Sequence, residues 1–298
     1  MRRVWTCSGL RWSGDGPVLV WGGGRTSPLA PGRRVAFGVV DGGVRTCVGA
    51  RGNACPMRAV VSPRGTGARC EECARLDRAH SVAADTLADD PRPYRVYLAW
   101  FGPGMVKVGI TRVERGSVRL LEQGAVTFSW LGQGPLMAAR RTEELLRAAL
   151  GVPDRIPYAD KRAVRAVLPE AGERVAELRE LHGRAGDLDG WPESVVRAPF
   201  EPVDHADVFG LAGLPPARVA VRELAAGGAV SGELCGVAGP DLHLLTGRGA
   251  VVLDTRLMTG WDLTGAGAGA GGADGGSGVT FPVRELPVAD AGVQDGLF

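Results

Sequence analysis

Periodic patterns of apolar residues are clearest in the middle of the chain. Apolar runs over 95–101 and 105–110 are separated by Gly102, Pro103 and Gly104, which predicts a β-hairpin. The residues that follow predict a short helix, a third strand and two longer helices, at 117–123, 125–131, 135–150 and 170–187. This order of elements is typical of a small sheet packed against helices.

The regions on either side of this segment are strand-like. Apolar runs at 17–21 and 35–40, broken by Gly and Pro clusters, predict a small N-terminal sheet. After Trp191, glycine-rich turns separate apolar segments that predict a small sheet or barrel, at 218–224, 229–237, 242–246 and 250–254. The Gly- and Ala-rich stretch 265–278 cannot bury a face and predicts a flexible loop, followed by an edge strand at 279–285. The sequence therefore predicts an α+β fold.

A length of 298 residues is enough for two or three small domains. The first residues lack the continuous apolar stretch of a secretory signal, and no run approaches the length of a membrane span. We therefore expect a cytoplasmic protein that does not enter a membrane. In that compartment the six cysteines are expected to remain reduced.

Four cysteines precede the central segment, at Cys47, Cys55, Cys70 and Cys73. Two residues separate the last pair, a gap that lets two thiolates of one turn face a single ion, and seven residues separate the first pair. The pattern predicts a zinc ribbon with structural zinc. Cys7 and Cys235 are left as isolated thiols.

Charge is distributed unevenly, although the net charge is only +2. Residues 92–165 contain 13 Lys or Arg and 6 Asp or Glu, whereas residues 231–298 contain 3 and 8. The basic segment is suited to binding phosphate, and the alternative is a solvated surface with ordinary helix ion pairs. Lys107 and Lys161 are the only lysines among the 35 basic side chains, and both lie in this segment.

Sparse polar residues in the basic segment point to phosphodiester chemistry. The four candidates for catalysis are Tyr97, Lys107, Arg119 and Glu143. Cleaving a phosphodiester requires a group that activates water, a cation that stabilises the developing negative charge, and an oxygen ligand for a divalent metal such as Mg or Mn. The four side chains offer each of these.

These residues resemble the GIY-YIG nuclease superfamily over about 95–161. Tyr97 falls at the tyrosine of the first motif and Gly109 at the glycine of the second, within the sequence KVGIT, and Lys107 replaces the second tyrosine. Arg119 and Glu143 follow on the predicted helices, as in that superfamily. The resemblance implies a three-stranded core in which Tyr97 activates water with help from Lys107, Arg119 holds the phosphate, and Glu143 is the ligand of a divalent metal. Gly109 and Thr111, which match the second motif, are candidates for substrate binding. Arg115 and Lys161 are candidates for extending a phosphate-binding track, and the alternative for them is an ordinary exposed charge.

Each candidate also has a structural alternative. Glu143 borders the apolar face of its helix and can instead pair with Arg140 or Arg147, whereas Glu144 has the arginine neighbours of a solvated ion-pair face. Arg119 has Glu122 three residues later as an ion-pair partner. Tyr97 can simply fill the sheet, Gly109 can allow a close backbone approach, and Thr111 can cap the next segment.

The ribbon and the core together resemble a prokaryotic domain-of-unknown-function family of the DUF2797 type. The expected divisions are an N-terminal β segment at 1–46, the zinc ribbon with a short helix at 47–90, the GIY-YIG-like core at 91–190 and a β-rich region at 191–298. The leading hypothesis is a nucleic-acid-acting protein that cleaves DNA or RNA. The alternatives are a non-catalytic zinc-ribbon module that binds nucleic acid or a protein partner, and a structural adaptor.

Overall fold

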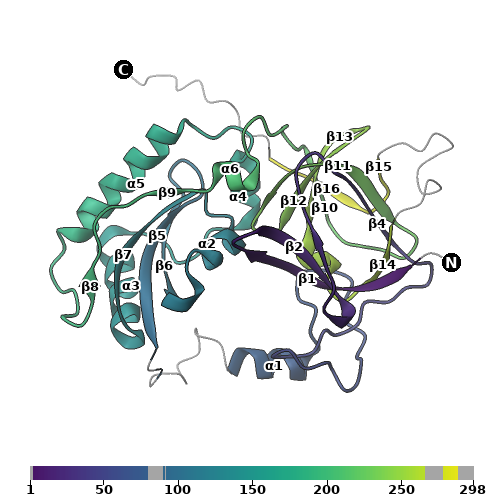
Figure 1. Ribbon diagram of the computed structural model, residues 1–298, viewed down its shortest axis with the longest axis horizontal. Coiled ribbons are helices and arrows are strands. Elements are labelled where there is room, and N and C mark those ends of the chain that lie inside the picture. Colours follow the sequence, from purple (N-terminus) through teal and green to yellow (C-terminus); the bar gives the residue numbers. More distant parts are fainter. Residues whose placement is uncertain (1–2, 80–89, 91, 266–277, 288–298) are drawn as a thin grey trace. The chain divides into compact units, whose positions relative to one another are not determined.

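The fold is known from a computed structural model that describes residues 3–79, 90, 92–265 and 278–287. These residues form a mixed α+β structure with an 11-stranded sheet, a five-stranded sheet and seven α-helices (Figure 1). The chain divides into two compact units, one made of residues 1–87 and 217–285 and the other of residues 88–216 and 286–298. The predicted α+β class is confirmed.

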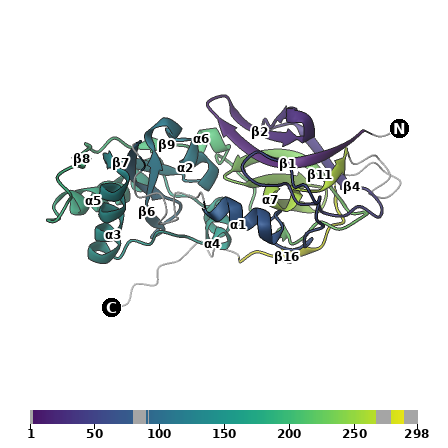
Figure 2. The ribbon, with the colours of Figure 1, turned by 90° about the horizontal axis from the view of Figure 1, so that it is seen from below.

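The first unit is built on the 11-stranded sheet. Its strand order is β16-β10-β13-β12-β11-β4-β14-β1-β2-β3, with β15 paired to β11. The bounds are Val4–Ser13 (β1), Gly16–Trp21 (β2), Thr26–Pro28 (β3), Arg34–Val39 (β4), Val219–Val221 (β10), Ala229–Ala238 (β11), Asp241–Thr246 (β12), Gly249–Asp254 (β13), Asp262–Thr264 (β14), Gly278–Val279 (β15) and Val283–Glu285 (β16). The adjacent antiparallel strands β1 and β2 can be followed in Figure 2.

Strands from the two ends of the sequence pair within this sheet. β4 is antiparallel to both β11 and β14, with Phe37 opposite Val230 and Val39 opposite Leu263. The N-terminal and C-terminal β regions, expected as separate segments, therefore share one sheet. β16 lies at the end of the sheet beside β10, as expected for an edge strand. The predicted flexible loop lies almost entirely outside the described residues.

Arg45 attaches the cysteine-containing segment to the sheet of the first unit. Its side chain is only 1% exposed. The guanidinium donates hydrogen bonds of 2.8–3.1 Å to four carbonyl oxygens, those of Ser62, Gly65, Arg256 and Thr259. Two of these acceptors follow Cys55 and two follow β13, so one buried cation fixes the cysteine segment against the C-terminal strands. The same unit contains the helices α1 (Glu71–Ala79) and α7 (Thr255–Met258).

The second unit contains the five-stranded antiparallel sheet in the order β6-β5-β7-β8, with β9 paired to β7. Its strands are Pro93–Trp100 (β5), Val106–Arg112 (β6), Thr127–Pro135 (β7), Val196–Arg197 (β8) and Val203–Asp204 (β9). Its helices are Val118–Gln123 (α2), Leu136–Leu150 (α3), Tyr158–Val164 (α4), Ala171–Gly186 (α5) and Ala206–Phe209 (α6). The predicted hairpin, third strand and helices are confirmed, each within a few residues of its expected bounds.

The two faces of the β5–β6–β7 sheet are covered by different elements. α3 packs against all three strands, and α5 packs against β5 and β7. Trp100 faces α5, where its indole donates a 2.6 Å hydrogen bond to Glu177. On the opposite face Tyr97 packs in a cluster with Leu120 of α2 and with Ile156. None of the helices in the described part of the chain is long and apolar enough to cross a membrane.

Candidate active site and candidate metal centre

The residues of the predicted catalytic site lie around the edge strand β6. Tyr97 of β5 is directly opposite Gly109, and Ala99 is opposite Lys107. Because side chains alternate along a strand, Lys107, Gly109 and Thr111 share the face that carries Tyr97. α2 supplies Arg119 and α3 supplies Glu143.

Tyr97 is a packed core residue. It is 1% exposed, and its ring meets that of Trp130 edge-on at a centroid distance of 6.2 Å. Gln123 donates a 3.1 Å hydrogen bond to its hydroxyl oxygen. Burial raises the pKa of Tyr97 above 10, although Gln123 and the positive charge of Arg119 act in the opposite direction. This environment disfavours the phenolate that a general base would need at neutral pH.

Gly109 leaves room for the Tyr97 ring. A Cβ atom at this position would clash with the tyrosine hydroxyl and would lie 2.5 Å from Cζ. The absence of a side chain at Gly109 therefore has a packing explanation that involves no substrate.

Replacing Gly109 by alanine should lower the free energy of unfolding by about 1–3 kcal/mol, the usual cost of overpacking. Urea denaturation measures this loss. The same change in a Tyr97→Leu background should be less destabilising, because the clashing ring is gone. Gly183→Ala is the control, since a Cβ there meets nothing within 4 Å and α5 should tolerate it. Equal losses in the two backgrounds would contradict this explanation.

Lys107 is an ammonium group held largely out of water. It is 9% exposed, its Nζ atom donates a 3.3 Å hydrogen bond to the carbonyl oxygen of Asp154, and Nζ lies 5.8 Å from the centre of the Tyr97 ring. Burial lowers the pKa of Lys107 to about 8, helped by the charge of Arg119 and opposed by that of Glu143. The lowered pKa makes a minor neutral fraction accessible near physiological pH, and this neutral amine is the form that can accept a proton.

Glu143 is half-buried on α3. Burial raises its pKa above the usual value, and the positive charge of Lys107 partly offsets this effect. Lys107 and Glu143 thus influence each other electrostatically, and the negative charge of Glu143 also raises the pKa of Tyr97. A nearby cation would stabilise the charged form of this half-buried carboxylate.

The arginines of the site are exposed and share one acidic partner. Glu122 forms ion pairs with Arg115 at 2.7 Å and with Arg119 at 3.4 Å. The ion pair expected as the structural alternative for Arg119 is therefore present. Because the pair is exposed, it is weak, and it does not prevent Arg119 from contacting an incoming anion.

Thr111 and Lys161 lie in the core of the second unit. The Thr111 hydroxyl is buried and has no hydrogen-bond partner among the described residues. Lys161 is 3% exposed, donates a hydrogen bond to the carbonyl oxygen of Gln123, and lies 3.7 Å from the centre of the Phe101 ring. This position suits a cation–π contact better than the surface phosphate contact expected from the sequence.

Two neighbours of the site, Gln123 and Asp154, were not predicted to belong to it. Gln123 reaches the Tyr97 hydroxyl from α2, and Asp154 offers its carbonyl oxygen to Lys107 from the segment after α3. The spacing of Gln123, one turn after Arg119, could have suggested its proximity. Nothing in the local sequence could have indicated the contact of Asp154.

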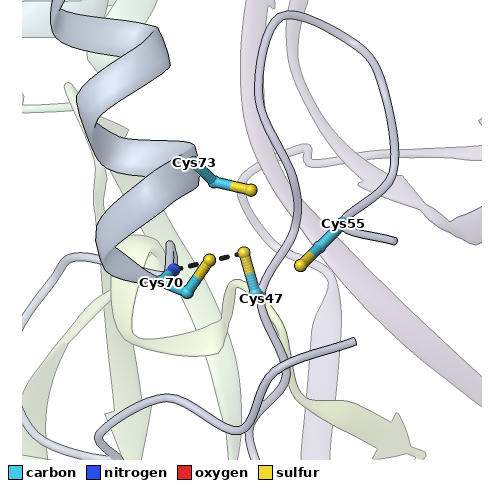
Figure 3. A group of neighbouring side chains, drawn as sticks. All are labelled: Cys47, Cys55, Cys70 and Cys73. Atoms are coloured by element: carbon cyan, nitrogen blue, oxygen red, sulfur yellow. Dashed lines mark hydrogen bonds between the residues drawn. The ribbon is translucent and has the colours of Figure 1, made fainter. Parts of the chain in front are cut away.

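The four clustered cysteines converge in the first unit. Their sulfur atoms all lie within 4.8 Å of one another (Figure 3). In a tetrahedral zinc–thiolate site, bonds of about 2.3 Å place the sulfurs roughly 3.8 Å apart, so this set fits a metal ion of that kind. All six cysteines of the chain are free thiols, and Cys7 and Cys235 are outside the cluster.

Backbone amides support the sulfur atoms. The amides of Gly49 and Cys70 donate hydrogen bonds to the Cys47 sulfur at 3.3 and 3.2 Å. Hydrogen bonds from the backbone of Ala59 and Met57 lower the pKa of Cys55 to about 7, against the effect of burial. Amide donors stabilise thiolates, the form that binds metal. The four residues can therefore hold a metal ion.

Fold and site define a two-unit α+β protein with a four-cysteine candidate metal centre. The chain belongs to the family described as protein of unknown function (DUF2797), whose model matches residues 32–263. This match covers the cysteine cluster and the whole second sheet. Searches of the curated proteins and of the solved structures each returned no match.

Proposed function

We propose that this protein acts on nucleic acid and cleaves a phosphodiester strand at the Lys107–Glu143 site. The observation that carries the proposal is the buried amine of Lys107, 5.8 Å from the Tyr97 ring, with Arg119 and Glu143 close enough to act on it electrostatically. A proton acceptor, a phosphate-binding cation and a carboxylate are the groups that strand cleavage requires. The element order β5-β6-α2-β7-α3, with β5 between β6 and β7, supports a likeness to the GIY-YIG core.

In this mechanism each side chain has a separate task. Glu143 would hold a divalent Mg or Mn ion, which when bound supplies Lewis-acid stabilisation of the phosphate charge. Arg119 contacts the scissile phosphate. Lys107 takes the proton of the attacking water. Tyr97, expected from sequence to activate the water, instead positions Lys107 through packing, because burial raises the pKa of its hydroxyl.

We further infer that the four-cysteine cluster holds structural zinc. Four thiols with amide support form the ligand set of closed zinc sites, which leave no open position for chemistry. In this proposal the protein works in the cytoplasm, where thiols remain reduced. Zinc then stabilises the loops of the first unit.

A second candidate function is nucleic-acid binding without cleavage. The replacement of the second motif tyrosine by Lys107 and the burial of Tyr97 favour it. Such a module would bind with strong salt dependence and no turnover, because phosphate contacts release counterions. A protein partner is the outcome that remains if no nucleic acid binds.

The pH dependence of cleavage tests the role of Lys107. Because the neutral amine is the active form, the rate should rise with pH and level off above the Lys107 pKa of about 8. Lys107→Arg keeps the positive charge but cannot release its proton, so it should lose about 10²–10⁴-fold in rate while it still binds substrate. Single-turnover rates and fluorescence anisotropy measure the two effects. An arginine variant that cleaves at the wild-type rate would exclude Lys107 as the base.

A further inference from the structure

Two arginines in the loops of the cysteine cluster have an unusual backbone. Among the described residues, only Arg51 and Arg58 combine a side chain with positive φ, at 54° and 44°. The left-handed region is unfavourable for residues with a Cβ atom, and glycine normally occupies it. Other left-handed positions in the same loops are indeed glycines, at Gly49, Gly52 and Gly65.

Both arginines lie in tight turns that flank Cys55. Ala50 and Asn53 exchange backbone hydrogen bonds of 3.0 and 2.9 Å, so Arg51 and Gly52 form a two-residue turn in which both φ angles are positive. Asn, Asp or Gly usually occupies the first position of such a turn. Arg58 ends the next turn, where its amide donates a 3.1 Å hydrogen bond to the Cys55 carbonyl oxygen. The backbone of each turn is therefore held by its own hydrogen bonds, one turn between Ala50 and Asn53 and the other at the Cys55 carbonyl.

Neither arginine is neutralised by a neighbour. Both are exposed, and no ion pair joins either of them to an acidic side chain among the described residues. Three other exposed arginines of the segment are paired, namely Arg64 with Glu223, Arg69 with Asp77 and Arg75 with Glu72, whereas the exposed Arg78 on α1 has no ion pair among the described residues. Met57, 80% exposed, lies between Cys55 and Arg58. The turns thus present two unpaired guanidinium groups with a flexible apolar side chain.

We propose that the turns at Arg51 and Arg58 form a phosphate-binding surface that contacts the backbone of a nucleic acid. The choice of partner rests on the proposed function. Arginine is suited to phosphate because its planar guanidinium donates two parallel hydrogen bonds. Contacts of this kind position a nucleic acid without reading its sequence.

Arg51→Gly, Arg58→Gly and the double variant test this surface. Glycine removes the charge and also relieves the left-handed conformation, so the unfolding temperature should not fall. Binding to a fluorescent single-stranded DNA, its duplex and the matching RNA is measured by anisotropy over a range of salt, without added Mg²⁺ or Mn²⁺. Each single variant should bind about tenfold more weakly at about 0.1 M salt, and the slope of log K against log salt should shrink by about one for each arginine removed. Arg75→Ala is the matched control, because it removes the same charge from an arginine already paired with Glu72.

The proposal is overturned if the double variant keeps the wild-type affinity and salt slope, if Arg75→Ala weakens binding as much as either glycine variant, or if the wild-type protein binds none of the probes. The cleavage proposal fails differently. A salt slope reduced in the double variant, together with no cleavage by the wild-type protein, would support this surface and count against the nuclease. Cleavage by the wild-type protein, together with unchanged binding by the double variant, would support the nuclease and count against this surface.

Discussion

Glu143→Gln is expected to reduce metal-dependent strand cleavage on the order of 10³-fold or more. Glutamine keeps the size and shape of the side chain but removes the negative charge that would hold the divalent ion, and such an ion supplies several kcal/mol of transition-state stabilisation. Because Glu143 is half-buried and its pKa is raised by burial, its neutral replacement should not destabilise the fold. The rate is measured on labelled DNA and RNA with Mg²⁺ or Mn²⁺.

Glu144→Gln provides the matched control for this prediction. The two glutamates are adjacent on α3, and each substitution removes one negative charge, but Glu144 is exposed. The Glu144 variant should therefore cleave at close to the wild-type rate. Similar losses in both variants would show that the net charge of the helix matters, and a fully active Glu143 variant would remove this residue from the mechanism.

Cys73→Ser is expected to release the metal of the four-cysteine cluster and to destabilise the first unit by several kcal/mol. The free energy of binding structural zinc, about 10–16 kcal/mol in small zinc-binding peptides, is coupled to folding. Cys73, on α1, is buried with its sulfur beside the three others, and the two remaining cysteines, Cys7 and Cys235, lie outside the cluster. Metal content by mass spectrometry and the unfolding temperature measure the two effects together.

Cys235→Ser is the control for the cysteine prediction, since this thiol lies on β11 outside the cluster. It should retain the metal and the wild-type unfolding temperature. The prediction fails if wild-type protein purified without chelators contains no stoichiometric metal, or if Cys73→Ser unfolds at the wild-type temperature.

The elements that could be predicted from sequence are those with local causes. Gly102 and Gly104 mark the turn between β5 and β6, and the helical repeat of apolar residues marks α3 and α5. The cysteine cluster was predicted from spacing, because two of its ligands lie on one turn. Each of these signals is contained within a few residues of the chain.

Long-range pairing could not be predicted. Nothing near β4 indicates that its partners are β11 and β14, about 190 and 225 residues later. β1 was not predicted, because its sequence lacks strict alternation and its pairing with β2 shifts register between Cys7 and Gly9. A strand that depends on tertiary partners leaves a weak local signal.

The proximity of some candidate residues could be predicted from sequence, whereas their catalytic roles stay a prediction. Tyr97 and Lys107 share one face of the sheet, but their burial limits the chemistry each can perform. Tyr97 fills the space left by Gly109, and Lys161 lies beside Phe101 in the core. The orientation of a side chain relative to the core depends on packing between elements, which the residue types alone do not specify.

The most direct test of the central claim is cleavage by the purified wild-type protein of labelled single-stranded, duplex and branched DNA and RNA, with Mg²⁺ or Mn²⁺ added and then withheld. The account predicts cut products that require the divalent ion, at a rate that rises with pH through the Lys107 pKa of about 8 and levels off above it. Salt-dependent binding with intact substrates under every condition would contradict cleavage at the Lys107–Glu143 site.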